Sequence, residues 1–597
     1  MSKVDQRESL EYRGFPISPG IAIGKAAVFN EAGPEEIPEY RIAPERVDSE
    51  LMRYRHAVNQ TREDLRNLVR SIEEELGSSE ADIFRVHLSV LDDPSLNGEV
   101  ERAIVEEKLN VESALSQAIE KFSKLLSAVS DKMLRERAAD IRDVGRQMLA
   151  KLMLDRQGST WTLDEKVVVV AADLSPAITV RLDREKILGF VAEALGPTSH
   201  AAILARSLGV PAVGAVRGLV LTVSPEDIFV VDGSTGLVYV NPPKEILEHY
   251  REVKRKAEAR KRALAKLVDL PSVTRDGEEV ALMANLGKAS EIGAAMKANA
   301  DGIGLFRTEF PFLARGDAPS EQEQFEHYRQ VVERMAPKPV IIRTLDVGGD
   351  KFPPYITVPR ETNPYLGWRG LRLLLRHKDI FKTQLRAILR ASHFGNVSVM
   401  YPVVSGLEEL RMARMLFEEV RNELRGEKVP IGEHVKQGAM IEVPSAVVIV
   451  DLILREVDFI SVGTNDLTQY VLAINRNSES LAPFFDSFHP AMIRTLRTLA
   501  SAARRAKKSI SICGEMGGDL VAARLLIGLG FRTLSMVPVS ILPMKELVRS
   551  VDLKECRHLA LGALRKETAW EVRNYLLEAA EAETAAAEAE TAAAETA

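Results

Sequence analysis

The stretch Val340-Ile-Ile-Arg-Thr-Leu-Asp346 is one of eight short apolar runs that follow one another from Glu279 onward. Helical stretches separate each run from the next. Eight strand-then-helix units in about 250 residues are what a (β/α)₈ barrel requires. The sequence therefore predicts a TIM-like barrel over residues 271–575. We expect its strands at residues 280–285, 302–307, 340–346, 397–403, 439–442, 459–463, 509–514 and 534–537.

Arginines stand at or near the ends of several of these runs, where the active sites of such barrels lie. Arg307 and Arg343 close the second and third runs, and Arg369 and Arg476 follow later strands. A guanidinium group binds carboxylate or phosphate oxygens with two parallel hydrogen bonds. A single arginine here is open to a structural ion pair, but four of them predict a multiply charged anionic substrate.

Two carboxylates end the neighbouring fifth and sixth runs, Glu442 and Asp466. Mg²⁺ commonly takes one or two protein carboxylates and completes its shell with substrate oxygens and water. The alternative is that either carboxylate pairs with an arginine. For Asp466, which lies beside Asn465 in Gly463-Thr-Asn-Asp-Leu-Thr-Gln-Tyr470, the metal interpretation is favoured.

Cys513 ends the seventh run in Ile512-Cys-Gly-Glu515. Cysteines are often simply buried. At the mouth of a cationic barrel, however, a thiol is suited to donate or accept a proton. The other cysteine, Cys556, has no such setting. Two cysteines in 597 residues form no disulfide framework and fit a reducing cytoplasm.

A second candidate site lies in Gly196-Pro-Thr-Ser-His200-Ala-Ala-Ile-Leu-Ala-Arg206, which is typical of a tight loop that enters a helix. His200 falls in the first turn, where free backbone N–H groups and the helix dipole favour an anion. A histidine that only packs or caps is the alternative. Together with the anion and metal site of the barrel, His200 indicates phosphoryl transfer through phosphohistidine, with a swivel between domains.

The rest of the chain divides into segments that differ in their predicted secondary structure. Strand patterns on both sides of a glycine-poor helical block predict an α/β phosphohistidine domain over residues 1–43 and 155–243, with an α-helical domain inserted at 44–154. Residues 244–270 form a polar linker helix. Residues 576–597 repeat Ala, Glu and Thr with a period of seven but without large apolar residues, which predicts a disordered tail.

The net charge of −7 argues against a nucleic-acid binder, and no apolar run spans a bilayer.

These motifs match a known family. The chain resembles Enzyme I of the bacterial phosphoenolpyruvate-dependent sugar phosphotransferase system from about Gly14 to Asn574. The resemblance is carried by Leu195-Gly-Pro-Thr-Ser-His200, Gly304-Leu-Phe-Arg-Thr-Glu-Phe310, Arg343-Thr-Leu-Asp-Val-Gly-Gly-Asp-Lys351, Asn363-Pro-Tyr-Leu-Gly-Trp-Arg369, the segment from Gly463 to Tyr470, and Cys513-Gly-Glu515.

The resemblance implies a role for each matching residue. His200 is then the phosphorylated nucleophile, Thr179 orients its imidazole, and Cys513 protonates the enolate to give pyruvate. Phosphoenolpyruvate is held by arginines and an amide, and Mg²⁺ by two carboxylates. The resemblance also implies a homodimer formed through the barrel and docking of the phosphocarrier HPr on 44–154, where Glu73–Glu75, Glu80 and Asp82 are candidate contacts. The expected ligands are Arg307, Arg343, Asn465, Arg476 and Arg369 for the substrate, and Glu442 and Asp466 for the metal.

The chain departs from the family pattern at the histidine loop, where Leu195 replaces a glycine and Pro197 replaces a frequent arginine. Asn475 also stands where an acid often precedes Arg476. Three alternatives stay open. A dikinase or phosphoenolpyruvate synthase needs an ATP-binding domain, for which the insertion at 44–154 is too small. The second alternative, a nitrogen-system paralogue of Enzyme I, would require a sensory domain ahead of the first strand. A non-catalytic HPr-binding scaffold is favoured only by the altered loop.

Overall fold

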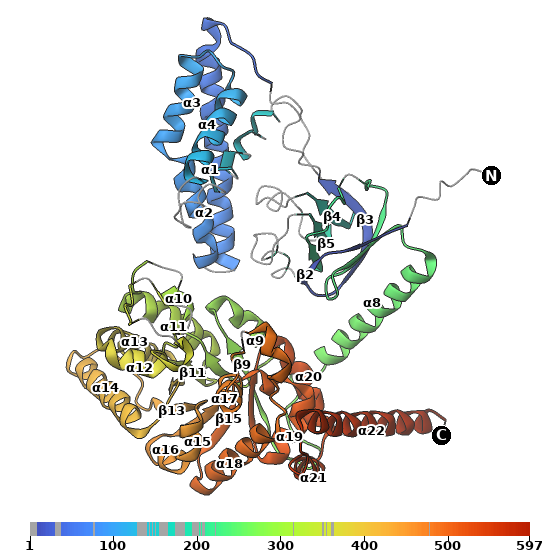
Figure 1. Cartoon of the computed structure of the whole chain (residues 1–597), viewed down its shortest axis with the longest axis vertical. Coiled ribbons are helices and arrows are strands. Elements are labelled where there is room, and N and C mark those ends of the chain that lie inside the picture. The colour runs from blue at the N-terminus through green and yellow to red at the C-terminus, as the bar shows by residue number, and fades with distance from the viewer. Residues whose placement is uncertain are drawn as a thin grey trace. The chain divides into compact units, whose positions relative to one another are not determined.

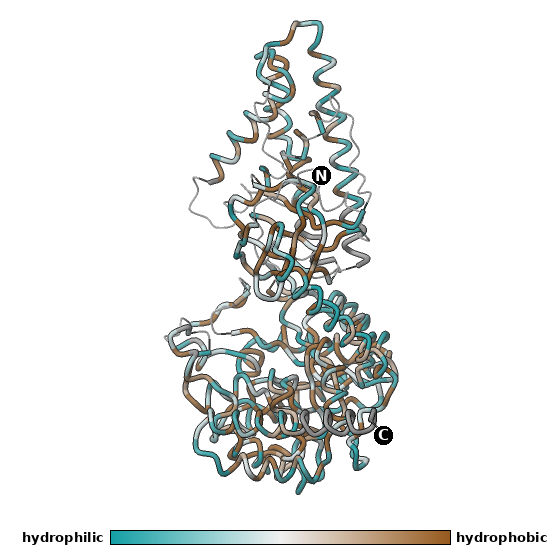
Figure 2. The backbone as a smooth tube through the Cα atoms, turned by 90° about the vertical axis from the view of Figure 1, so that its right-hand side faces the viewer, coloured by the Kyte–Doolittle hydropathy of each residue, from teal (hydrophilic) through white to brown (hydrophobic). Residues whose placement is uncertain are grey.

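A computed structural model gives the architecture of the chain (Figure 1). It describes residues 9–29, 38–75, 78–127, 140–142, 144–145, 147–149, 151–153, 165–172, 186–193, 202, 205, 209–220, 222–313, 316–348, 352–353, 355–359, 363–476 and 478–596. Contacts divide the chain into two compact units, Met1–Arg260 and Lys261–Ala597. In many helices of both units, the colour in Figure 2 changes repeatedly between hydrophobic and hydrophilic along the tube.

The second unit is built on a closed barrel of eight parallel strands, and each predicted run is one of them. The prediction of a TIM-like barrel is confirmed. Neighbouring strands pair in chain order, and the eighth returns to pair with the first. The strands are β9 (Ala281–Leu286), β10 (Ile303–Phe306), β11 (Val340–Arg343), β12 (Val397–Tyr401), β13 (Lys436–Ile441), β14 (Phe459–Val462), β15 (Ser509–Ile512) and β16 (Thr533–Met536).

Helices follow the strands and bury one apolar face against the barrel. In α13, for example, Phe381, Leu385 and Ile388 recur at helical spacing and are fully buried. The helices are α9 (Ile292–Lys297), α10 (Phe310–Leu313), α11 (Glu321–Met335), α12 (Gly370–Arg376), α13 (Lys378–Ala391), α14 (Leu407–Gly426), α15 (Pro444–Val448), α16 (Val450–Glu456), α17 (Thr464–Leu472), α18 (Pro490–Ala506), α19 (Leu520–Leu529), α20 (Ile541–Ser550), α21 (Leu553–Ala563) and α22 (Ala569–Thr596).

Local capping explains where some of these helices begin. Ser320 precedes α11, and its hydroxyl accepts a hydrogen bond from the Glu323 N–H, while the Glu323 carboxylate accepts one from the Ser320 N–H. This capping box satisfies two N–H groups that the first turn leaves free. Asp519 accepts from the N–H groups of Val521 and Ala522 at the start of α19 in the same way.

His327 on α11 gives the barrel unit a predictable acid sensitivity. Its ring lies 5.4 Å from the Phe306 ring, and its Nε2 is buried with no hydrogen-bond partner among the described residues. Burial lowers the pKa of His327 to about 4. Because this is below its unfolded pKa of about 6.5, the unfolded chain binds the proton more tightly, and stability falls as the pH drops from 6.5 toward 4.

We expect the substitution His327→Phe to remove this contribution. Between pH 7 and pH 5, the free energy of unfolding of the barrel unit should fall by about 2 kcal/mol less in the variant than in the unsubstituted chain. Denaturant unfolding at the two pH values measures this difference. Equal losses in the two proteins would contradict the assignment of the neutral, buried imidazole.

The first unit contains an eight-stranded sheet in the order β1-β8-β7-β3-β4-β5-β6-β2. Its central strand β4 is fully buried, as its unbroken apolar run predicts. The predicted strands on either side of the helical block are present and pair in this one sheet. The strands are β1 (Leu10–Arg13), β2 (Phe15–Ser18), β3 (Ile21–Phe29), β4 (Val167–Ala171), β5 (Ile187–Ala192), β6 (Ala212–Gly214), β7 (Ile228–Asp232) and β8 (Leu237–Val240).

The helical block forms a core of its own around Tyr54, Leu65, Val100 and Leu115. Two buried carboxylates, Glu50 and Glu112, receive hydrogen bonds from one arginine, Arg53. Its helices include α1 (Val47–Glu75), α2 (Ser78–Leu91), α3 (Pro94–Val105) and α4 (Val111–Ser127).

Helix α8 (Lys244–Ala265) occupies the predicted linker, and Tyr250 is its only buried residue. The C-terminal segment differs from the prediction of a disordered tail over 576–597, because α22 continues as helix to Thr596. The physical reason is twofold. Val572 and Leu576 anchor its first turns in the barrel core, and the alanine-rich remainder contains no glycine or proline to stop the helix. Across the described residues, no helix combines the length and the apolar character that crossing a membrane demands.

Candidate active site

The barrel brings most of the predicted site residues to the C-terminal ends of its strands. Arg343 is the last residue of β11, and Arg307 directly follows β10. The other predicted residues follow strands or begin the next helix. Glu442 comes after β13, Asn465 and Asp466 lie in the first turn of α17, Cys513 comes after β15, and Arg369 is the N-cap of α12.

Arg343 is buried, with 8% of its surface exposed, and carboxylates hold the two Nη atoms of its guanidinium group. Its Nη2 donates to Glu309 Oε1 at 2.7 Å, and its Nη1 lies 3.0 Å from Asp346 Oδ2. The Nε atom is buried and has no hydrogen-bond partner among the described residues. A buried donor without a partner is costly, so this guanidinium is held at the end of β11 with one donor still unsatisfied by the described residues.

Asp346 links two arginines of the site. Arg369 donates to both of its oxygens, at 2.9 and 3.0 Å, and Arg343 contacts it from the other side. Burial raises the pKa of Asp346, but Arg343 and Arg369 outweigh this and hold it at about 2. Gly348 permits the approach, because a Cβ there would lie 2.6 Å from the Cβ of Arg369.

Arg369 and Asp466 form an ion pair at 2.9 Å, and Arg476 lies 3.6 Å from the other oxygen of Asp466. Arg369, expected to contact the substrate, thus has its Nε, Nη1 and Nη2 engaged by carboxylates. Asp466 keeps free lone pairs in this arrangement, since each oxygen faces only one arginine.

Glu442 is 1% exposed, and its Oε1 accepts a hydrogen bond from the Val403 N–H at 2.7 Å. Among the described residues it has no ion-pair partner. Burial, and then the carboxylates of Asp466 and Asp346, raise its pKa to about 8. A buried carboxylate facing two others is a setting that a divalent cation stabilises, so these residues fit Mg²⁺. Among the described residues, no group of three or more His, Cys, Asp or Glu side chains is arranged to hold a metal ion by itself.

Cys513 is buried among Leu305, Met400 and Met440 at the base of the mouth. Its Sγ lies 3.5 Å from the Val462 carbonyl oxygen, to which it donates. Burial raises the pKa of this thiol to about 11. The group is therefore protonated at neutral pH and suited to donate a proton rather than to act as a nucleophile.

Asn465 is held by a reciprocal pair of hydrogen bonds with Glu515. Its Nδ2 donates to Glu515 Oε1, and its Oδ1 accepts from the Glu515 N–H, both at 3.0 Å. Glu515, two residues after Cys513, therefore holds the Asn465 side chain of α17 close to the end of β15.

The sequence did not predict that Asp346 and Glu309 belong to this group of paired arginines and carboxylates. Asp346 ends the third predicted run, and a carboxylate at a strand end was the signal already used for the metal ligands. Glu309 lies in the quoted segment from Gly304 to Phe310 but had no assigned role. The predicted His200, Thr179, Leu195 and Pro197 lie outside the described residues, as do the side chains of Glu73–Glu75, Glu80 and Asp82.

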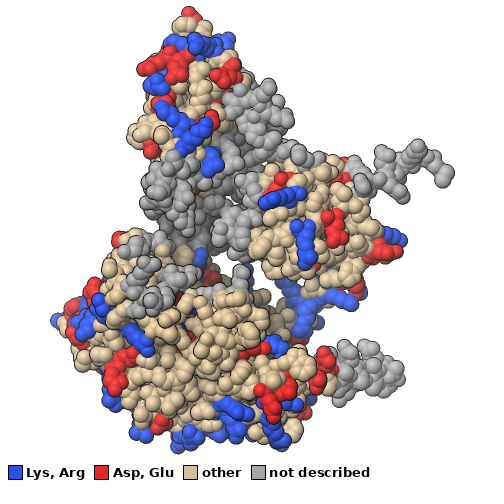
Figure 3. Space-filling model, viewed as in Figure 1, with Lys and Arg blue, Asp and Glu red and all other residues tan. Residues whose placement is uncertain are grey.

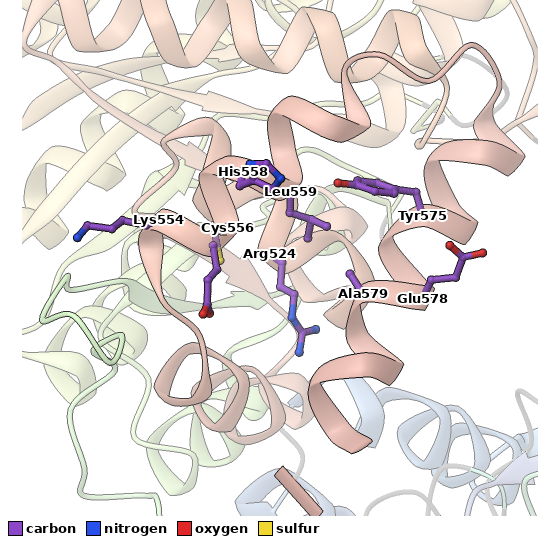
Figure 4. A pocket seen from close by; sticks show the side chains of 9 residues that line it. Arg524, Lys554, Cys556, His558, Leu559, Tyr575, Glu578 and Ala579 are labelled. Carbon is purple, nitrogen blue, oxygen red and sulfur yellow. The ribbon is translucent and has the colours of Figure 1, made fainter. Parts of the chain in front are cut away.

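A separate cavity of about 550 Å³ lies between α19, α21 and α22 (Figure 4). Arg524, Lys554, His558 and Tyr575 line it, together with Cys556. None of the predicted site residues takes part, so this cavity is distinct from the barrel mouth.

Three family models match the chain. Residues 13–137 match the PEP-utilising enzyme N-terminal domain, residues 163–236 its mobile domain, and residues 261–553 its PEP-binding domain. The phosphoenolpyruvate-protein phosphotransferase of Bacillus sp. (strain S) is 39% identical over 563 residues, which cover 94% of this chain and 97% of that protein. The chain belongs to the PEP-utilising enzyme family.

A second member of the PEP-utilising enzyme family, the phosphoenolpyruvate-protein phosphotransferase of Geobacillus stearothermophilus, is 40% identical with the same coverage of both chains. A solution structure of an Enzyme I protein is 34% identical, covers 41% of this chain and 99% of its own, and has a TM-score of 0.35. The family resemblance drawn from the motifs is confirmed.

Proposed function

We propose that this chain transfers a phosphoryl group from phosphoenolpyruvate to its own His200 and then to a histidine of the phosphocarrier HPr, releasing pyruvate. The observation that carries the proposal is the buried cluster of arginines and carboxylates at the barrel mouth, in a chain similar over 94% of its length to phosphoenolpyruvate-protein phosphotransferases. The sequence of the histidine loop supplies the phosphoryl acceptor.

The arginines of the mouth bind the substrate in this proposal. Arg343 supplies positive charge at the end of β11, and the exposed Arg307, with Arg476, adds to it. Asn465 donates from an amide that Glu515 orients. Arg369 acts through its ion pairs, holding Asp346 and Asp466 in place while adding positive charge to the site.

Glu442 and Asp466 are the proposed holders of Mg²⁺. When bound, the ion supplies positive charge that stabilises the oxygens of the phosphate and of the developing enolate. The network supports this assignment, because Glu442 is buried without an ion-pair partner among the described residues, next to two other carboxylates.

Cys513 completes the reaction by protonating carbon. The bond between phosphorus and the enol oxygen breaks as phosphorus bonds to the imidazole nitrogen of His200, and the electron pair stays on the enolate. The enolate carbon then takes the thiol proton of Cys513 to give pyruvate, and water returns a proton to the thiolate. Thr179 orients the resting imidazole.

We also infer the partners. The helices between residues 44 and 154 dock HPr, and a second copy of the chain associates through the barrel, where large apolar side chains such as Val448, Phe484 and Val539 are exposed. Acidic and basic side chains are interspersed over the visible face of that unit, with no large field of one sign (Figure 3). We infer a cytoplasmic location, where a thiol such as that of Cys513 stays reduced.

The test is the mass of the chain after incubation with phosphoenolpyruvate and Mg²⁺. We expect one added phosphoryl group that is acid-labile, requires Mg²⁺ and is absent from the His200→Ala variant. Transfer to HPr proteins is then measured by loss of that mass. No added mass on folded protein would overturn the catalytic proposal and favour the non-catalytic scaffold, for which the altered loop at Leu195 and Pro197 is the argument.

A further inference from the structure

The segment 343–346 carries both Arg343 and Asp346, so its backbone sets where two charged groups of the mouth lie. Three elements hold it. The Thr344 N–H donates to the Met400 carbonyl oxygen on β12. The Oε1 atom of Glu309 accepts two hydrogen bonds, one from Arg343 Nη2 at 2.7 Å and one from the Asp346 N–H at 3.1 Å. The third support lies behind the segment, away from solvent.

This third support is a buried glutamine on α13. Gln384 is 0% exposed. Its Oε1 accepts a hydrogen bond from the Leu345 N–H at 2.9 Å, which fixes the middle of the segment. Its Nε2 donates to the Thr308 hydroxyl at 3.1 Å and to the Tyr328 hydroxyl at the same distance. Both N–H groups and the oxygen of this side chain therefore have a hydrogen-bond partner.

Thr308 extends the support to the start of the segment. Its hydroxyl is fully buried and donates to the Arg343 carbonyl oxygen at 3.0 Å. Three successive residues after β10 thus serve the same site. Arg307 is exposed at the end of β10, Thr308 holds the Arg343 backbone, and Glu309 holds the Arg343 side chain.

We infer that Gln384 and Thr308 are positioning residues that set the affinity of the site for phosphoenolpyruvate by fixing the backbone of segment 343–346. Neither side chain contacts the mouth. They act by limiting the freedom of Arg343 and Asp346, because a charged group that is already in place loses less conformational entropy when it binds its ligand. The inference rests on the proposed function, which makes Arg343 a substrate-binding residue.

The test compares apolar substitutions of similar volume. Gln384→Met removes every hydrogen bond of the glutamine, and Thr308→Val removes only the hydroxyl, whereas Thr308→Ser retains it. Gln437→Met is the matched control. Gln437 is also buried and bonded to a tyrosine, Tyr401, but it lies at the opposite end of its strand and has no bond to the segment.

The affinity for phosphoenolpyruvate with Mg²⁺ is measured by calorimetry on full-length chains that carry His200→Ala, so that binding is read without transfer. We expect Gln384→Met and Thr308→Val each to weaken binding about 10-fold. Thr308→Ser and Gln437→Met should stay within about 3-fold of the parent, a difference of less than 1 kcal/mol. The melting temperature of each variant is recorded separately.

A purely structural role would lower the melting temperature of all the apolar variants and leave the dissociation constant unchanged, which would overturn the inference. Equal weakening in Thr308→Ser and Thr308→Val would also overturn it, because the hydroxyl would then be irrelevant. Failure of the parent chain to bind phosphoenolpyruvate would overturn both the inference and the proposed function. Binding without phosphorylation of His200 in the unsubstituted chain would count against the proposed function alone.

Discussion

Replacement of Cys513 by alanine will lower the rate of pyruvate formation by about 10²–10⁴-fold, the usual contribution of a positioned general acid. The thiol is buried beside the mouth, and burial raises its pKa to about 11, so at neutral pH it carries the proton that the enolate carbon needs. Without the thiol, the enolate is protonated only by water that reaches the site. The rate is measured by coupling pyruvate release to lactate dehydrogenase in the presence of HPr.

The chain provides its own control for this substitution. Cys556 is equally buried, at 2% exposed, but it lies on α21 beside the separate cavity. Cys556→Ala should therefore leave the rate of pyruvate formation unchanged. If Cys513→Ala were no slower than Cys556→Ala, Cys513 would be a packing residue and another group would supply the proton.

Replacement of Asp346 by asparagine will destabilise the barrel unit by about 2 kcal/mol, the contribution that corresponds to lowering its pKa from 3.8 to about 2. Asp346 neutralises both Arg343 and Arg369, and the substitution leaves Arg343 with Glu309 and Arg369 with Asp466 as their remaining carboxylates. The charge of a buried guanidinium cannot be removed by deprotonation. Binding of phosphoenolpyruvate should change as well, because Arg343 is no longer held on this side.

Denaturant unfolding of the barrel unit measures this cost. The matched control is Asp486→Asn, which removes a carboxylate from a partly exposed pair with Arg573 and should cost no more than about 1 kcal/mol. The folded-state pKa of Asp346, about 2, lies below its ordinary value of 3.8. Its contribution is therefore present above about pH 4 and is lost as the pH falls toward 2. A gap between variant and parent that closed near pH 6 would contradict the ion-pair assignment.

Much of the fold was predictable because its signals are local. A parallel barrel strand is buried on both faces, so its signal is a segment of four to six residues in which apolar residues predominate or alternate with small polar ones, and the helix after it carries a period of 3.6. The same holds for β4, where Val167 to Ala171 are all apolar and all buried. The tail was not predicted correctly, because a helix without large apolar residues lacks the periodicity on which the assignment rests.

The membership of the site was also largely predictable, because the ends of barrel strands converge. Arg343, Glu442, Asp466 and Cys513 could be named from their positions after apolar runs. Their pairing could not. Arg369 lies 97 residues from Asp466 in the sequence, and only closure of the barrel brings their side chains to 2.9 Å. The two ion pairs of Arg369, with Asp346 and Asp466, could likewise not be read from the sequence.

By itself, the sequence determined which residue types stand at the ends of the barrel strands, since these residues follow short apolar runs, and it contains the motif in which His200 is the proposed phosphoryl acceptor. Only the tertiary structure decided how those charges are shared. In the structure, Glu442 has no ion-pair partner among the described residues, and Asp346 is paired with two arginines. Gln384 lies behind the segment that bears Arg343. The physical reason is that electrostatic and hydrogen-bond energies depend on distance and burial in space, neither of which is encoded in the spacing of residues along the chain.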